Sequence, residues 1–124
     1  MSTAPGAVEV QIFGSKKHAA TRAALRYFAE RRTKTHFVDL NERAASPGEL
    51  LRFAQQFGAE ALVDRTAKRF SELGLGSARY GDARWIAVLA EEPLLIRQPL
   101  TRCKQQVAIG VSPDAWAAWI VGAK

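Results

Sequence analysis

Hydrophobic and polar residues recur with two different periods along the first third of this chain. Segment 8–13 alternates apolar and polar side chains, which predicts a half-buried strand, and segment 35–40 predicts a second short strand. Between them, residues 16–31 contain no proline or glycine and repeat apolar side chains at helical spacing, so they predict a helix. A strand, a helix and a strand with short connections predict a parallel pair joined by a right-handed crossover.

The middle of the chain carries helical patterns only. Ser46, Pro47 and Glu49 provide an N-cap, a proline at the first helical position and a capping-box glutamate, so a helix is predicted from there to Phe57, before Gly58. Further helical stretches are predicted at residues 59–65, 66–73 and 82–91. This block forms a helical insertion between the two halves of the fold.

The last third returns to strand patterns before a final helix. Residues 94–96 and 99–103 predict a strand that enters a hairpin, and residues 107–109 predict the returning strand. Residues 112–120 predict the last helix, whose tryptophans are interpreted as packing residues. The expected fold is a single α/β domain over residues 1–124 with a four-stranded mixed sheet, in the order β-α-β, helical insertion, β-β-α.

Composition limits the cellular compartment and the partners that can be expected for this domain. The 124 residues suit one domain, and the longest apolar stretches are far shorter than the ~20 residues that cross a bilayer. The start of the chain has no export pattern, and the single cysteine, Cys103, excludes an internal disulfide. We therefore expect a cytoplasmic protein without a membrane partner. The net charge of +6 favours phosphates, nucleic acid or acidic protein surfaces as partners.

Several short strings carry a family resemblance over nearly the whole chain. They are QIFGSKKHAATR, VDL, GELLRFAQQFGAEALVDR, FSELGL, PLLI, the proline-led hairpin and VAIGVSPDAW, in that order. Each string is weak alone, but their succession resembles the arsenate-reductase-like family (ArsC, Spx and YffB proteins), which has the thioredoxin-like fold. The resemblance therefore implies that fold and a site at the start of the first helix.

The resemblance also implies which residues stand at the family's functional positions. The family's catalytic cysteine matches His18, and its arsenate-binding arginine matches Gln98. Arg65 matches a second anion-contacting arginine, although the spacing to the next motif is one residue shorter. Pro99 matches a proline expected to follow a cis peptide bond beside the active-site loop.

The change at position 18 limits the chemistry. Family catalysis needs a thiolate stabilised by the start of a helix, and an imidazole cannot form a mixed disulfide with glutathione. We expect a protein without conventional arsenate reductase activity that binds a small anion or a protein partner at the former active-site face. The candidate binding residues are Ser15, Lys16, Lys17, His18, Arg22, Arg65, Gln98 and Pro99. No catalytic residue and no metal site are predicted, and His18 as a mere filler of the helix start stays an alternative.

Other function classes stay open. A reductase that uses Cys103 or bound glutathione is the enzyme alternative, and glutathione is the only cofactor considered. Spx-like regulators dock on RNA polymerase, but they sense redox through a CxxC pair that this chain lacks. Basic residues surround the first helix, yet no nucleic-acid motif accompanies them, so they are interpreted as a solvated surface and nucleic acid is not an expected partner. The sequence does not indicate an oligomeric state.

Overall fold

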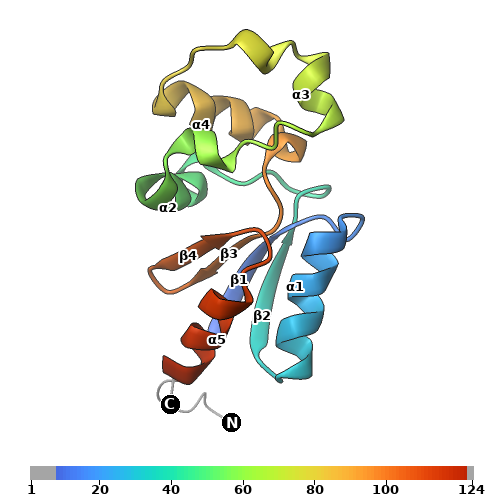
Figure 1. Cartoon of the computed structure of the whole chain (residues 1–124), viewed down its shortest axis with the longest axis vertical. Coiled ribbons are helices and arrows are strands. Elements are labelled where there is room, and N and C mark those ends of the chain that lie inside the picture. The colour runs from blue at the N-terminus through green and yellow to red at the C-terminus, as the bar shows by residue number, and fades with distance from the viewer. Residues whose placement is uncertain (1–7, 123–124) are drawn as a thin grey trace.

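A computed structural model describes residues 8–122 of the chain, and its centre is a four-stranded mixed sheet (Figure 1). The strands are β1 (Glu9–Gly14), β2 (Lys34–Asp39), β3 (Leu100–Cys103) and β4 (Gln106–Ile109), in the spatial order β2-β1-β3-β4. β1 pairs with β2 in parallel and with β3 antiparallel, and β3 and β4 form the hairpin. The predicted α/β fold class is confirmed.

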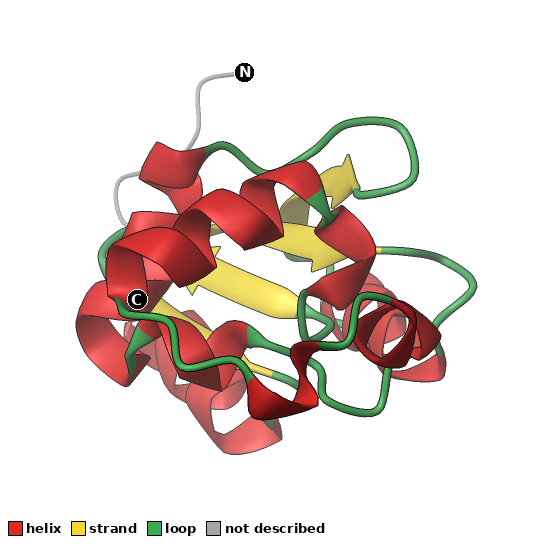
Figure 2. Cartoon of the chain, turned by 90° about the horizontal axis from the view of Figure 1, so that it is seen from above, coloured by secondary structure: helices red, strands yellow, loops and turns green. Residues whose placement is uncertain are grey.

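Helices flank the sheet and form a separate block at one of its ends. The α-helices are α1 (Ala19–Glu30), α2 (Pro47–Phe57), α3 (Lys68–Glu72), α4 (Asp82–Glu91) and α5 (Pro113–Gly122). Three short 3-10 helices, η1 (Ala59–Leu62), η2 (Leu75–Ser77) and η3 (Pro93–Leu95), lie between them. α1 and α5 run beside the strands, whereas α2, α3 and α4 gather beyond one end of the sheet (Figure 1). Viewed from that end, helices overlie the strands (Figure 2).

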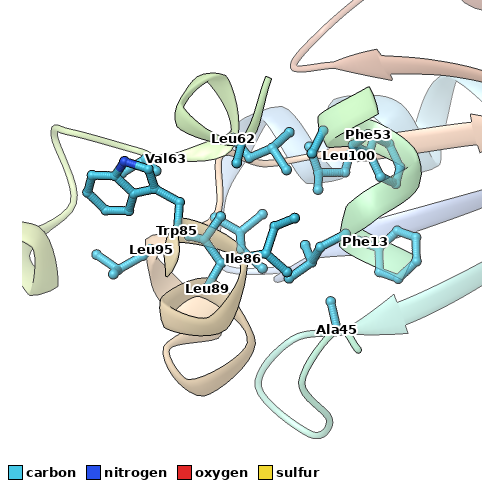
Figure 3. Packing of buried hydrophobic residues seen from close by; sticks show 14 of the residues in the cluster. Phe13, Ala45, Phe53, Leu62, Val63, Trp85, Ile86, Leu89, Leu95 and Leu100 are labelled. Carbon is cyan, nitrogen blue, oxygen red and sulfur yellow. The ribbon is translucent and has the colours of Figure 1, made fainter. Parts of the chain in front are cut away.

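β1 supplies side chains to two hydrophobic clusters, because its successive side chains point to opposite faces. Ile12 joins α1 and α5 in one cluster, which contains Phe28 and Trp116. Within this cluster the buried Trp116 indole N–H donates to the Thr101 hydroxyl at 3.0 Å. Phe13 joins the other cluster, where the helical block packs on the end of the sheet (Figure 3). β1 therefore ties the block to the rest of the domain.

The sequence predictions need three corrections. Residues 94–96 were expected in a strand, but Pro93 opens η3 there and Ile96 forms only an isolated bridge with Val63. The first helix begins at Ala19 rather than Lys16, because His18 has an extended backbone and acts as its N-cap. The segments 59–65 and 66–73 contain only the four-residue η1 and the five-residue α3. No helix among residues 8–122 is long and apolar enough to span a membrane.

The start of α2 shows why the sequence located this helix correctly. The Ser46 hydroxyl accepts from the Glu49 N–H at 3.1 Å, and the Glu49 carboxylate accepts from the Ser46 N–H at 2.9 Å, so both halves of the capping box form. Arg43 donates both terminal nitrogens to the same carboxylate, at 3.0 and 2.8 Å. This paired guanidinium is the main reason that the pKa of Glu49 falls from 4.5 to about 2.

The lowered pKa predicts how stability depends on pH. Because the pKa of Glu49 is lower in the folded chain than in the unfolded chain, its contribution is present above pH 4.5 and is lost as the pH falls toward 2. Glu49→Gln keeps an oxygen for the cap and removes the charge, so it should lower the free energy of unfolding by roughly 0.5–1 kcal/mol at pH 7. Urea unfolding between pH 7 and pH 2 measures both effects.

The matched control for this prediction is Glu42→Gln, an exposed neighbour at the surface of the preceding loop. The Glu49→Gln chain should lose less stability than the natural chain between pH 4.5 and 2, whereas the Glu42→Gln chain should follow the natural profile. Identical slopes for all three chains would contradict the prediction.

Candidate functional site

The loop from Ser15 to His18 joins the end of β1 to the start of α1, and its path depends on Gly14. A Cβ atom at Gly14 would lie 2.8 Å from the Thr21 methyl group and closer still to the Thr21 hydroxyl. Real Cβ atoms do not approach other atoms so closely, so no larger residue fits unless Thr21 or the start of α1 moves. Glycine at this position lets the helix pack directly against the strand end.

Polar contacts on both sides hold Ser15 at the base of the loop. Its backbone N–H donates to the Gln98 side-chain oxygen at 2.6 Å, and the Thr21 hydroxyl donates to the same oxygen at 3.1 Å. The Ser15 hydroxyl accepts from the Asn41 side chain at 2.7 Å and from the Lys17 N–H at 3.2 Å. These bonds connect the loop to the end of β2 and to the segment that enters the hairpin.

Asn41 is a site residue that the sequence analysis missed. It lies two residues after the end of β2, and the carboxyl ends of the parallel strands β1 and β2 lie at the same edge of the sheet. A polar side chain just after a strand that pairs with β1 was therefore the available signal. Its neighbour Asp39 accepts from the Asn41 N–H at 2.9 Å, which fixes the turn from which the Asn41 side chain reaches Ser15.

His18 caps the first turn of α1. Its backbone is extended, with φ −92° and ψ 125°, and its Nδ1 atom accepts from the Ala20 N–H at 3.3 Å. An Nδ1 atom that accepts a hydrogen bond carries no proton, so in this arrangement the ring proton is on Nε2. The side chain is exposed, which leaves the Nε2–H group able to donate to a ligand.

Three exposed cationic side chains surround this helix start. Arg22 folds back so that one terminal nitrogen donates to the Lys16 carbonyl at 2.8 Å. The Lys16 ammonium lies 5.7 Å from the centroid of the Phe37 ring. Lys17 is exposed in the middle of the loop. The structure thus brings five of the eight predicted residues, Ser15 to His18 and Arg22, into one short region.

Gln98 and Pro99 lie beside this region. The peptide bond between them is cis, as expected, and Pro99 is buried, with its carbonyl accepting from the Gly110 N–H at 2.8 Å. Gln98 turns its side-chain oxygen toward Ser15 and Thr21 and so supports the loop. A direct contact of Gln98 with an anion stays a prediction.

Arg65 makes its contacts within the helical block. Its guanidinium pairs with Glu60 at 2.7 Å and lies 5.4 Å from the centroid of the Phe70 ring. Both charged side chains are about half exposed. Anion binding by Arg65 stays a prediction, and it would require this arginine to leave or share its carboxylate partner.

Comparison with known proteins shows the family of this chain. The sequence model of the ArsC family matches residues 13–119, which include every candidate residue of the loop, the block and the hairpin entry. The chain belongs to the ArsC family. Comparison with curated proteins found no match.

Solved structures agree with the fold of this ArsC-family chain. An arsenate reductase from Vibrio cholerae is 26% identical, with a TM-score of 0.77 over 95% of this chain and 99% of that one. A structure described as the YFFB (PA3664) protein is 21% identical, with a TM-score of 0.81 over 90% of this chain and 98% of that one. An arsenate reductase related protein from Brucella melitensis is 21% identical, with a TM-score of 0.66 over 92% and 96% of the two chains. The thioredoxin-like fold is thereby confirmed.

The single cysteine of the chain lies away from the loop. Cys103 is the last residue of β3, where it is 6% exposed and packs in the cluster between the sheet, α1 and α5. Because Leu100 pairs with Phe13, Cys103 lies three residues farther from the loop, roughly 10 Å along the strand. Burial raises the pKa of the Cys103 thiol. Among residues 8–122, no three potential metal-ligating side chains gather.

The tight contact between β1 and α1 gives a prediction for the loop. Gly14→Ala should lower the free energy of unfolding by roughly 1–3 kcal/mol, because the new methyl group overlaps the Thr21 side chain. Thr21→Ala removes the overlapping atoms, so the double variant should be more stable than the sum of the two single effects predicts. Urea unfolding of the four chains measures this coupling.

The matched control for the loop is Gly76→Ala, since a Cβ atom at Gly76 meets nothing within 4 Å. This variant should unfold with nearly the natural free energy. Full additivity of the Gly14 and Thr21 substitutions would show that the contact does not constrain the loop.

Proposed function

We propose that this ArsC-family protein works without the thiolate chemistry of a conventional arsenate reductase and binds an anionic ligand or a protein partner at the Ser15–His18 loop. The observation that carries the proposal is that the residue capping α1 is a histidine, while the only cysteine of the chain is buried in β3. The family resemblance aligns His18 with the catalytic cysteine. The helix start that would stabilise a thiolate therefore carries an imidazole.

The different chemistry of a cysteine thiolate and a histidine imidazole supports a role without thiolate catalysis. A thiolate can attack one sulfur of a disulfide, so that a new disulfide forms and the other sulfur leaves as a thiolate, whereas an imidazole has no sulfur for such an exchange. Cys103 is a poor substitute, because burial disfavours its thiolate and its position in β3 keeps it away from the loop. A cycle in which bound glutathione supplies the thiol is the enzymatic rival.

The loop has groups that suit an anion. α1 is twelve residues long, and its first N–H groups and the positive end of its dipole favour negative charge. Lys16 and Lys17 add two exposed ammonium groups, and His18 offers its Nε2–H as a donor. A phosphate, an arsenate or the carboxylate of an acidic protein partner presents the oxygens that these donors require.

An arsenate reduction assay separates binding from catalysis. With glutathione and glutaredoxin present, the natural chain and Cys103→Ser should both show no turnover above the blank without protein. His18→Cys places a thiol at the N-cap, where its pKa should fall, so this thiol should react with iodoacetamide faster than Cys103 does in the natural chain. NADPH consumption coupled to glutathione reductase measures turnover, and mass spectrometry measures alkylation.

Two outcomes of the assay would favour the enzymatic rival. Turnover by the natural chain that Cys103→Ser abolishes would make Cys103 the working thiol. Turnover that survives Cys103→Ser but requires glutathione would assign the thiol to bound glutathione. Either result contradicts a purely binding role.

Binding at the loop can be measured directly. Titration with arsenate or phosphate should shift the backbone amide resonances of residues 15–20 in an ¹⁵N spectrum. The double variant Lys16→Gln, Lys17→Gln should weaken this binding by about tenfold, because it removes two charge-assisted donors. A control that removes two charges elsewhere is Lys68→Gln with Arg84→Gln. Equal weakening in both double variants would assign the effect to net charge and not to the loop.

A further inference from the structure

One half of one sheet face is left uncovered by helices. α1 and α5 pack on the face that carries Val10 and Ile12. On the opposite face, the helical block packs on Phe13, Val38 and Leu100 and so covers only the end of the sheet near the loop. Farther from the loop, β1, β2 and β3 carry polar residues on this second face, whereas β4 contributes the half-buried Val107 opposite Arg102.

The register places a row of polar residues across the uncovered half. His36 in β2 and Arg102 in β3 both pair with Gln11 in β1, so the three side chains point to the same face. His36 is exposed, while Gln11 and Arg102 are half-buried. Such a row cannot contribute to a hydrophobic core, which leaves it available for contacts with a ligand.

Arg102 is held in one orientation without a carboxylate partner. Its Nε–H donates to the Gln11 side-chain oxygen at 3.2 Å, and one terminal nitrogen donates to the Lys104 carbonyl at 2.6 Å. Within residues 8–122, no carboxylate lies within 4.0 Å of its guanidinium. A guanidinium that is fixed by neutral groups keeps its full positive charge for an incoming anion.

A hollow of about 370 Å³ lies between α2 and the β3-β4 hairpin, with Arg102 in its wall. Its polar lining consists of three cationic side chains and three glutamines, namely Arg52, Arg102, Lys104, Gln55, Gln56 and Gln105. No acidic residue lines it. This volume is in the range of small-ligand sites.

The space on the other side of Arg102 has a different charge. That hollow, of about 330 Å³, shares Arg102 and Lys104 with the first but is also lined by Glu9. The Glu9 carboxylate would repel an anionic ligand in that hollow. An anionic group is therefore favoured on the α2 side, where the polar side chains that line the space are cations and amides and the remaining lining residue is Val107.

We propose that the hollow between α2 and the hairpin binds a small phosphate-bearing ligand through Arg52, Arg102 and Lys104. Arginine forks match the oxygens of a phosphate in pairs, and the glutamine amides can donate to further oxygens or pair with polar groups of the ligand. Its lining contains no aromatic side chain on which a nucleic-acid base could stack. Small-molecule sites are typically concave and of this size, so the shape of the hollow favours a small molecule as its ligand.

The hollow is separate from the Ser15–His18 loop. Arg102 pairs with Gln11, which lies three residues before Gly14, so the two regions are roughly 10 Å apart along the strand. They also belong to different elements, since the loop precedes α1 and the hollow lies between α2 and the hairpin. Binding at one region can therefore be recorded independently of binding at the other.

A titration of the full chain with pyrophosphate at low salt tests the inference. We expect shifts in the side-chain amide resonances of Gln55, Gln56 and Gln105 in an ¹⁵N spectrum. Arg52→Gln and Lys104→Asn should each weaken this binding by about tenfold, because each removes one charge-assisted donor. Asparagine is chosen at position 104 because Lys104 has φ 57°, which asparagine tolerates.

The control variant is Arg26→Gln, which removes one exposed charge from α1 on the other side of the sheet. It should leave binding at the hollow unchanged. Shifts confined to residues 15–20 would overturn the inference and leave the loop proposal intact. Equal weakening by Arg26→Gln would also overturn it, as would a single-stranded oligonucleotide that binds the hollow more tightly than pyrophosphate.

Discussion

The side-chain oxygen of Gln98 accepts hydrogen bonds from the Ser15 backbone and the Thr21 hydroxyl, and these two bonds hold together the segments on which the site depends. Ser15 begins the loop after β1, Thr21 lies in the first turns of α1, and Gln98 precedes the hairpin. Since Gln98 is far in sequence from both Ser15 and Thr21, the bonds also fix how the two halves of the fold meet. Gly14 makes the arrangement possible, because any side chain there would overlap Thr21.

Features whose contacts are local in the sequence could be predicted, whereas features that depend on distant contacts could not. The capping box at Ser46 and Glu49 is local, so the pattern located α2 at the residues the structure shows. Ile96 was assigned to a strand because its neighbours are apolar, but Pro93 starts a turn and only one bridge, to Val63, forms there. Asn41 contacts Ser15 in the loop after β1, and Arg102 contacts Gln11 within β1. Their contacts follow from register, which a single sequence does not give.

Membership of the ArsC family depends on residues spread along the chain, whereas the chemistry of a site depends on a few side chains. The fold is carried by positions distributed over residues 13–119, and it is shared with an arsenate reductase at 26% identity. Thiolate chemistry depends on the position and surroundings of a single sulfur atom, and one fold can carry different functions. In this chain the start of α1 has its N–H groups, its dipole and the nearby ammonium groups of Lys16 and Lys17. These groups favour anions whether or not a reaction follows.

The cationic side chains of the described residues differ in whether a carboxylate lies beside them. Arg43, Arg65 and Arg69 each lie within 3 Å of a glutamate oxygen, so their charges are balanced inside the fold. Arg69 and Glu92 connect α3 to the end of α4, and the pairing lowers the pKa of that carboxyl. Within the part of the chain that the structure describes, Lys16, Lys17, Arg52 and Arg102 have no such ion pair. Unbalanced positive charge that gathers at a helix start and in a hollow adds to the self-repulsion of a chain with net charge +6, and a bound anion at either place would relieve it.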